Sequence, residues 1–290
     1  MFFDAGSLVR TGVNGLLDWL VAHHGDAFEA AAGMLLKPLV ALEQGLRLVP
    51  PWIALVIVAA LAFAATRRAV PTLAIAGCLY LVGCLGLWEQ AMQTVAILSV
   101  AVALAVAIGL PVGIVSARSA WLRAGITPLL DLMQTIPSFV YLIPAAMLFG
   151  LGKVPAIVAT VIYATPPLIR LTDLGLRQVD RQLTEAAKVL GANRWQVLRL
   201  VQLPLALPSI MQGVNQTTMM ALGMVVIASM IGARGIGETV LLGLQRADSG
   251  QGAVGGLAIV LLAIVFDRIT QGFGDRIQAG KAPGVKAPGA

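Results

Sequence analysis

The residues able to do covalent or metal chemistry are few in this sequence and do not form a group. Cys78 and Cys84 lie in one apolar run at a spacing that points them in different directions on a helix, and His23 and His24 are far away in the chain. The sequence contains no HExxH, GxSxG or GxxxxGK[ST] pattern. We therefore predict no catalytic residue and no metal site, and we expect the glycines of 232–237 to shape a turn.

One polar segment, Glu185–Pro204 (EAAKVLGANRWQVLRLVQLP), has the pattern of two short helices joined at a glycine. Gly191 readily takes the left-handed conformation that ends a helix. Asn193 begins the second helix, and Gln196 completes an Asn-x-x-Gln pattern similar to a capping box. The prolines that follow, at 204 and 208, are predicted to break this helix. Such an element suits docking to a soluble partner, although an ordinary amphipathic connector fits the pattern equally well.

The composition is that of an integral membrane protein. Of the 290 residues, 58% are hydrophobic and only 12% are charged, and the mean hydropathy is +0.88. A soluble domain has roughly 25% charged residues, so this chain has too few to cover a water-facing surface. The net charge of +6 comes from basic residues in short segments between apolar runs. We interpret them as orientation signals in a membrane lipid environment, with no nucleic acid as partner.

Seven apolar runs approach the length of about 20 residues that a helix needs to cross a bilayer. They are 49–65, 69–88, 92–117, 126–150, 154–171, 205–231 and 253–266. Basic residues gather in alternate loops, at Arg67 and Arg68, at Arg118 and Arg123, and between 177 and 199. Because such residues favour the cytoplasmic side, we predict an external amino terminus and a cytoplasmic carboxyl terminus.

The two ends of the chain differ from the spans. Residues 1–48 are apolar but interrupted by charges, and they predict amphipathic helices on the external membrane surface or, equally, a partly ordered leader. Residues 49–88 are predicted to add two membrane helices. The tail 279–290 repeats Lys-Ala-Pro-Gly and is predicted to be disordered.

Polar residues within the predicted spans are candidates for a solute path, because polar groups in a bilayer face protein or water. The six candidates are Thr135, Ser138, Tyr141, Asn215, Thr218 and Met219. Packing between helices explains any single one of them at least as well. Pro137 and Pro144 are expected to interrupt the fourth run and free backbone carbonyls. The three tyrosines do not cluster in sequence, so we expect no aromatic cage for a quaternary ammonium group.

The segment Glu185–Pro204 resembles the cytoplasmic loop of permease subunits of ABC importers. That family's pattern is Glu-Ala-Ala, three residues, Gly, nine residues and Ile-x-Leu-Pro, and Val201 stands here in place of Ile. The residues in register are Glu185, Ala186, Ala187, Gly191, Leu203 and Pro204. In the family this loop enters a groove on the ATPase subunit. The resemblance therefore implies an ATPase-coupling role for Glu185, Ala186, Ala187 and Gly191.

The resemblance covers residues 89–271, the type-1 permease core, with the coupling loop at about 172–204. The runs TIPSFVYLIP, YATPPLIR and GLQRAD, at 135–144, 163–170 and 243–248, are similar to the glycine betaine/proline/choline branch, as is the stretch 215–238. The expected fold is an all-α integral membrane protein with about seven transmembrane helices, the type-1 core being preceded by amphipathic helices.

The resemblance also implies the function and the partners. The chain would be the permease of an importer in the cell inner membrane for a quaternary-ammonium or related solute: glycine betaine, choline, proline betaine, carnitine or trimethylamine N-oxide. It would act as a homodimer with ABC ATPase subunits and an extracytoplasmic solute-binding protein. No cofactor is expected in this chain, and the partner ATPase would bind ATP and Mg²⁺.

Two other functions were weighed. A secondary transporter driven by an ion gradient would be expected to carry buried ionisable residues, and the predicted spans 92–117 and 205–231 contain none. An intramembrane enzyme would need a catalytic motif that the sequence lacks. A requirement for ATP distinguishes the importer from the first alternative, and a requirement for partner subunits distinguishes it from both.

Overall fold

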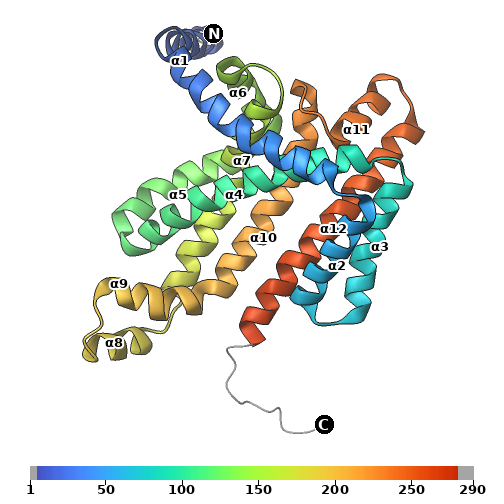
Figure 1. Cartoon of the computed structure of the whole chain (residues 1–290). Helices are drawn as coiled ribbons and strands as arrows, with labels where there is room; N and C mark the ends of the chain where they lie inside the picture. The colour runs from blue at the N-terminus through green and yellow to red at the C-terminus, as the bar shows by residue number, and fades with distance from the viewer. Residues whose placement is uncertain (1–4, 280–290) are drawn as a thin grey trace.

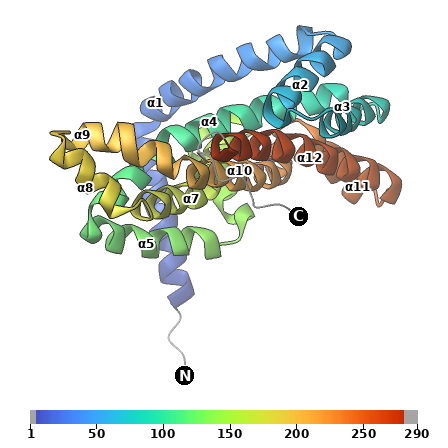
Figure 2. The same cartoon turned by 90° about the horizontal axis from the view of Figure 1, so that it is seen from below.

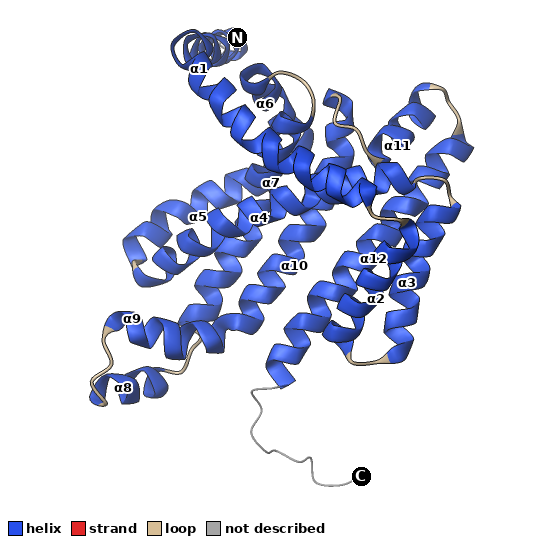
Figure 3. Ribbon diagram, viewed as in Figure 1, coloured by secondary structure: helices blue, strands red, loops and turns tan. Residues whose placement is uncertain are grey.

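The computed structural model describes residues 5–279, and in this range the chain forms helices joined by short loops, with no strand (Figures 1 and 3). The predicted disordered tail lies outside the described residues beyond Ala279. The helices, in chain order, are α1 (Ala5–Leu48), α2 (Pro51–Thr66), α3 (Ala69–Cys84), α4 (Trp88–Arg118), α5 (Ala120–Thr135), η1 (Ser138–Tyr141), α6 (Leu142–Phe149), α7 (Lys153–Arg177), α8 (Arg181–Val189), α9 (Arg194–Gln196), η2 (Val197–Gln202), α10 (Leu203–Ile227), η3 (Ala228–Ile231), α11 (Ile236–Gln245) and α12 (Ser249–Ala279).

The centre of the molecule is a tight packing of α4, α7 and α10. Small residues let the backbones approach closely, as is usual where helices pack in lipid. A Cβ atom added to Gly113 on α4 would lie 2.6 Å from the Cβ of Thr172 on α7. On a neighbouring face of α7, a Cβ added to Gly175 would lie 2.6 Å from the Cβ of Ser209 on α10. These contacts hold α7 between its two neighbours.

The lengths and the apolar composition of the helices agree with an integral membrane protein. Within the described residues, 4 helices are individually long and apolar enough to cross a bilayer, namely α4, α7, the run 194–231 and α12. The number rises to 6 if each of two bent helix pairs is one span, and α3 is a further apolar helix of 16 residues. The all-α membrane fold is confirmed.

The fourth predicted span, 126–150, is not one straight helix. The chain breaks between α5 and α6, whose directions differ by 105°. Pro137 has no N–H to continue the helix, and Ile136 before it is extended (φ −68°, ψ 129°). The proline predicted to interrupt this run therefore does so, but the outcome is two short helices with a sharp bend. Pro144, by contrast, lies inside α6.

The amino-terminal region forms one long helix, α1, with a kink at His24 (φ −130°, ψ 16°). Its carboxyl-terminal half packs on the core, where Leu39 is fully buried. The buried carboxylate of Glu43 accepts a hydrogen bond from Nζ of Lys153 at 2.5 Å. Arg47 lies 3.7 Å from Glu43 and 3.1 Å from Glu89 at the start of α4. These ion pairs fix α1 across the starts of α7 and α4.

The helices α2 and α3 form a hairpin that packs on α12. Their buried side chains, among them Ile75 and Val82, share one cluster with Leu262 of α12. Each helix has 16 residues and is about 24 Å long at 1.5 Å per residue, somewhat less than a bilayer core. The turn between α2 and α3 lies at the same end of the molecule as α8, α9 and the end of α12, whereas α1, α6 and α11 lie at the opposite end (Figure 1).

Candidate coupling site

The helix α8 stands away from the core and is fixed mainly at its ends. Its N-cap is Asp180, whose carboxylate accepts a hydrogen bond from the backbone N–H of Gln182 at 2.8 Å. In α8 no residue is fully buried, and Glu185 and Ala186 are exposed. The predicted coupling residues therefore lie on an accessible helix. The preceding helix α7 extends to Arg177, further than the predicted end of that span at 171.

The turn after α8 has the geometry that its sequence predicts. Gly191 has a φ of 84°, in the left-handed region, and its N–H donates to the carbonyl of Lys188 at 2.9 Å. Asn193 caps the next helix by accepting from the N–H of Gln196 at 2.9 Å. The Gln196 side chain in turn accepts from the N–H of Asn193 at 2.8 Å. Both the glycine stop and the capping box are confirmed.

The second helix does not break at its prolines, contrary to prediction. The run from Arg194 to Ile231 continues as one helical path, with a π-helical turn at η2. In this turn the N–H of Leu203 bonds to the carbonyl of Leu198, five residues earlier. Pro204 follows directly after this π-helical turn, as the second residue of α10. The loop is thereby joined rigidly to α10.

Two residues of η2 anchor this element to the core. Val197 and Leu198 are buried, and Leu198 belongs to a cluster with Leu168 and Leu176 of α7 and Ile210 of α10. A displacement of α8 and α9 therefore acts on the adjoining ends of α7 and α10 through packed side chains. Such packing moves as a unit because close-packed interiors resist compression.

Large apolar side chains are left uncovered at the tip of the same element. Val189 and Leu190 are each 87% exposed, and Trp195 is 64% exposed. Helix–turn tips in water do not gain stability from such residues, and an exposed apolar patch is typical of an interaction surface. Aromatic residues are also enriched at such surfaces.

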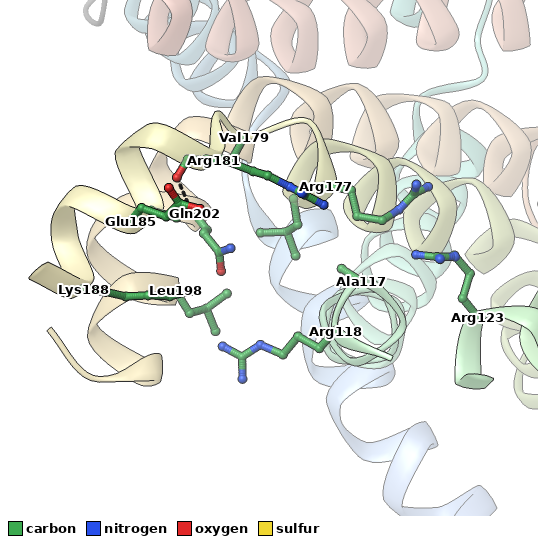
Figure 4. A pocket seen from close by; sticks show the side chains of 12 residues that line it. Ala117, Arg118, Arg123, Arg177, Val179, Arg181, Glu185, Lys188, Leu198 and Gln202 are labelled. Atoms are coloured by element: carbon green, nitrogen blue, oxygen red, sulfur yellow. Dashed lines mark hydrogen bonds between the residues drawn. The ribbon is translucent and has the colours of Figure 1, made fainter. Parts of the chain in front are cut away.

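A cavity of about 670 Å³ separates α8 from the ends of α4, α5 and α7 (Figure 4). Its lining is strongly basic, and Glu185 is the acidic residue among the residues that line it. The charged residues around it are Arg118, Arg123, Arg177, Arg181, Glu185 and Lys188. Asp173, buried beneath the rim, binds Arg177 at 2.8 Å and lies 4.0 Å from Arg123. Arg118, Arg181 and Lys188 have no ion-pair partner among the described residues, so they place Glu185 in a positive field.

Three of the predicted path residues lie at the break between α5 and α6. Thr135 bonds its hydroxyl to the carbonyl of Leu132 at 3.0 Å, and Ser138 begins η1. The Tyr141 hydroxyl donates to the carbonyl of Met133 at 2.8 Å, so it satisfies a backbone group freed by the bend. Tyr141 and Tyr163 have ring centroids 6.3 Å apart. Tyr141 and Tyr163, which are far apart in sequence, are therefore neighbours in the fold, whereas Tyr80 lies on α3.

The other three path candidates are on α10 and face different surroundings. Asn215 is hydrogen bonded to Asp267 on α12 at 2.9 Å, and Thr270 of α12 donates to Asn215 as well. Thr218 is buried and donates to the carbonyl of Val214 in its own helix at 2.8 Å. Met219 is partly buried. A path role for these six residues stays a prediction.

Sequence reasoning missed two positioning residues. Asp267 directly follows the predicted run 253–266 and Thr94 stands beside Gln93, and no local pattern reveals the partner of either residue. Thr94 accepts from the N–H of Ile236 at 2.9 Å, while Gly235 passes so close that a Cβ there would lie 2.6 Å from the Thr94 hydroxyl. The glycine-rich run after α10 is thus a turn, as predicted, and Thr94 holds it against α4.

Comparison with known proteins places this architecture. The family model described as "Binding-protein-dependent transport system inner membrane component" matches residues 109–279. The chain is 47% identical over 260 residues to the glycine betaine/proline betaine transport system permease protein ProW of Escherichia coli (strain K12), covering 89% of this chain and 73% of that protein. It is 41% identical over 259 residues to the glycine betaine transport system permease protein OpuAB of Bacillus subtilis (strain 168), covering 89% and 92%.

A similar solved structure is the MetNI methionine ABC transporter in an inward-facing conformation, with a TM-score of 0.58, 25% identity and coverage of 68% of this chain and 96% of that chain. The helical bundle and its projecting helix pair thus define a membrane-spanning transport permease. The chain belongs to the family of inner membrane components of binding-protein-dependent transport systems, the permease subunits of ABC importers.

Proposed function

We propose that the chain carries a small quaternary-ammonium or related solute into the cytoplasm, and that α8 and α9 receive the force for this from a partner ATPase. The observation that carries the proposal is the geometry of α8, Gly191 and α9. An exposed tip is joined to the helices α7 and α10 through Leu198, and Val197 beside it is buried as well. Closure of the ATPase would therefore tilt the ends of both helices.

The ATPase would bind ATP and Mg²⁺, and this chain would supply no cofactor site and no catalysis. Glu185, Ala186, Ala187 and Gly191 form the contact and its hinge. Glu185 lines the basic cavity. Its carboxylate can therefore interact both with the basic residues of this cavity and with basic groups of a partner. A solute-binding protein would deliver the solute from the opposite side.

The solute class rests on the relatives, whose names give glycine betaine, proline betaine, carnitine and trimethylamine N-oxide as cargo. The pair Tyr141 and Tyr163 offers two ring faces at the bend of the broken span. Cations are attracted to such faces when they approach within about 6 Å of the ring centroid. We place the transient solute path beside this bend and beside Thr218 and Met219 of α10.

The proposed orientation puts α8, α9 and the carboxyl terminus in the cytoplasm and the amino terminus outside. In support of this orientation, α8, α9 and the end of α12 share one end of the molecule, and the start of α1 lies at the other (Figure 1). The proposed unit is a homodimer. In its favour, α5, η1 and α6 expose apolar side chains, among them Leu132, Phe139 and Ile143, that a second copy would cover.

The test is uptake of radiolabelled glycine betaine, choline and trimethylamine N-oxide into proteoliposomes that contain this chain, its ATPase and its binding protein. Uptake should require internal ATP. Glu185→Arg should reduce uptake at least tenfold, because it places a sixth basic residue at the cavity and removes the acidic contact. The matched control is Glu29→Arg, the same change at an exposed position of α1, at the other end of the molecule.

Uptake by this chain alone, driven by a sodium or proton gradient and unchanged in Glu185→Arg, would overturn the proposal. Uptake that needs ATP but responds equally to the Glu29 and Glu185 changes would overturn the coupling role and leave the importer in place.

A further inference from the structure

A second basic cavity, of about 450 Å³, lies where the α2–α3 turn meets the end of α12. Four arginines and one carboxylate line it, together with small and amide side chains. The charged residues are Arg67, Arg68, Arg268, Asp275 and Arg276. Viewed from below, α2 and α3 lie beside α12 and on the opposite side of the molecule from α8 and α9 (Figure 2). This cavity is therefore separate from the coupling site.

The four guanidinium groups of this cavity outnumber its one carboxylate, Asp275. Among residues 5–279 no carboxylate lies within ion-pair distance of any of the four arginines. Arg276 donates to the carbonyl of Ala64 at 2.6 Å, which leaves its remaining N–H groups available. Converging arginines with free donors are a strong acceptor site for phosphate oxygens, because the guanidinium fork can bind two of them together.

The backbone holds the arginines in place in two ways. Arg67 ends α2 in the left-handed conformation (φ 53°), which L-residues other than Asn and Asp rarely adopt. Gly272 brings α12 against the end of α2, since a Cβ there would lie 3.1 Å from the Cβ of Ala65. Arg268, Gly272 and Arg276 are four residues apart and so share one face of α12, directed at the turn.

The surroundings of the cavity are lipid-facing. Phe63, Val70 and Leu73, on the helices that flank the turn, are 51%, 79% and 72% exposed. Apolar side chains of this kind on a membrane helix contact acyl chains. The arginines therefore lie at the level of the headgroups. The α2–α3 turn and the end of α12, which carry them, are at the end of the molecule that carries α8 and α9 (Figure 1).

We propose that this cavity binds the phosphate of an anionic phospholipid from the cytoplasmic leaflet, with the acyl chains lying along α2 and α3. Basic pockets between membrane helices on the cytoplasmic side are suited to such headgroups. The leaflet assignment rests on the proposed function, which places α8 and α9 in the cytoplasm. The lipid would tie the α2–α3 hairpin to α12.

A simpler explanation for Arg67 and Arg68 is that they only set the orientation of the hairpin. That explanation needs a charge in the turn but gives no reason for Arg268 and Arg276, some 200 residues later in the sequence, to line the same cavity. The convergence of the two segments favours a ligand.

The test is a lipid titration of the purified full chain in detergent, followed by native mass spectrometry. The probe is phosphatidylglycerol, and the zwitterionic comparison is phosphatidylethanolamine. The variant Arg68→Gln with Arg268→Gln should lower the affinity for phosphatidylglycerol by roughly 25-fold, at about fivefold for each arginine. The matched control, Arg194→Gln with Arg199→Gln, removes two exposed charges at the same end outside the cavity and should change it less than about twofold.

Arg67→Asn is the second variant, since Asn accepts the left-handed conformation and preserves the turn. It should lower the affinity for phosphatidylglycerol by about fivefold, as expected for one arginine. Equal losses in the control pair, or no preference for phosphatidylglycerol over phosphatidylethanolamine, would overturn the site. Displacement of the lipid by millimolar inorganic phosphate would show a site for soluble anions and overturn the lipid assignment. The titration needs neither ATPase nor solute, so lost lipid binding with normal uptake counts against this site alone. Intact binding without ATP-dependent uptake counts against the proposed function alone.

Discussion

Asn215 on α10 donates a hydrogen bond from its Nδ2 to Oδ1 of Asp267 on α12 across 2.9 Å. Thr270 donates to Oδ1 of the same asparagine, and Gln271 donates to Asp267 at 2.6 Å. Asn215 thus has both ends of its amide engaged by one neighbouring helix. The residue that the sequence offers as a solute contact joins α10 to α12 in this structure.

Asn215→Ala should therefore lower stability and leave solute affinity unchanged. We expect a loss of about 1 kcal/mol, since interhelical hydrogen bonds in membrane proteins contribute about 0.6 and at most about 1.7 kcal/mol. The measurement is thermal unfolding in detergent, with a double-mutant cycle to Asp267→Ala and with the KM for uptake. If the melting temperature of Asn215→Ala is unchanged and its KM for solute uptake differs from that of the original chain, Asn215 belongs to the path.

Gly175→Ala should destabilise the contact between α7 and α10. The new methyl would lie 2.6 Å from the Cβ of Ser209, and overpacking of this kind costs about 1–3 kcal/mol. Ser209→Gly in the same chain should restore much of the loss. Gly223→Ala on α10 is the control, because no atom lies within 4 Å of its added Cβ. Equal effects at 175 and 223 would argue against the close approach.

Lys153→Met should leave the buried Glu43 carboxylate without the cation that lies closest to it. Removing one member of a buried pair costs roughly 3–5 kcal/mol. We expect about 2 kcal/mol, below that range, because Lys153 is partly exposed and Arg47 remains near Glu43. Adding Glu43→Gln should recover part of the loss in thermal unfolding. If the double variant is less stable than Lys153→Met, the ion pair is not the cause.

Substitutions of Gly191 should separate coupling from stability. Its φ of 84° costs an ordinary L-residue about 1–2 kcal/mol, and Asn less. Because the turn is exposed and no atom lies within 4 Å of a Cβ added to Gly191, Gly191→Val should reduce ATP-dependent uptake severalfold and lower stability by no more than this backbone cost. Gly191→Asn should keep most of the uptake. Equal uptake by the two variants would show that the left-handed turn is not required.

Local chemistry alone determines several features of this protein. The apolar runs and scarce charges specify helices in a membrane, because the bilayer leaves backbone groups no other partner. The glycine stop at 191 and the capping box at Asn193 and Gln196 are interactions between near neighbours in the chain, so their residue types reveal them. The pattern from Glu185 to Pro204 also carried the family resemblance.

Only the tertiary structure decided the rest, because it depends on residues far apart in sequence. Asn215 meets Asp267, Lys153 meets Glu43, and Thr94 meets the turn at Gly235, and no local pattern encodes these pairs. The effect of each proline on its helix likewise could not be predicted from the local sequence. Pro137 sharply bends its span, whereas Pro204 is accommodated by a π-helical turn, and the difference lies in how the freed carbonyls and N–H groups find partners in the surrounding helices.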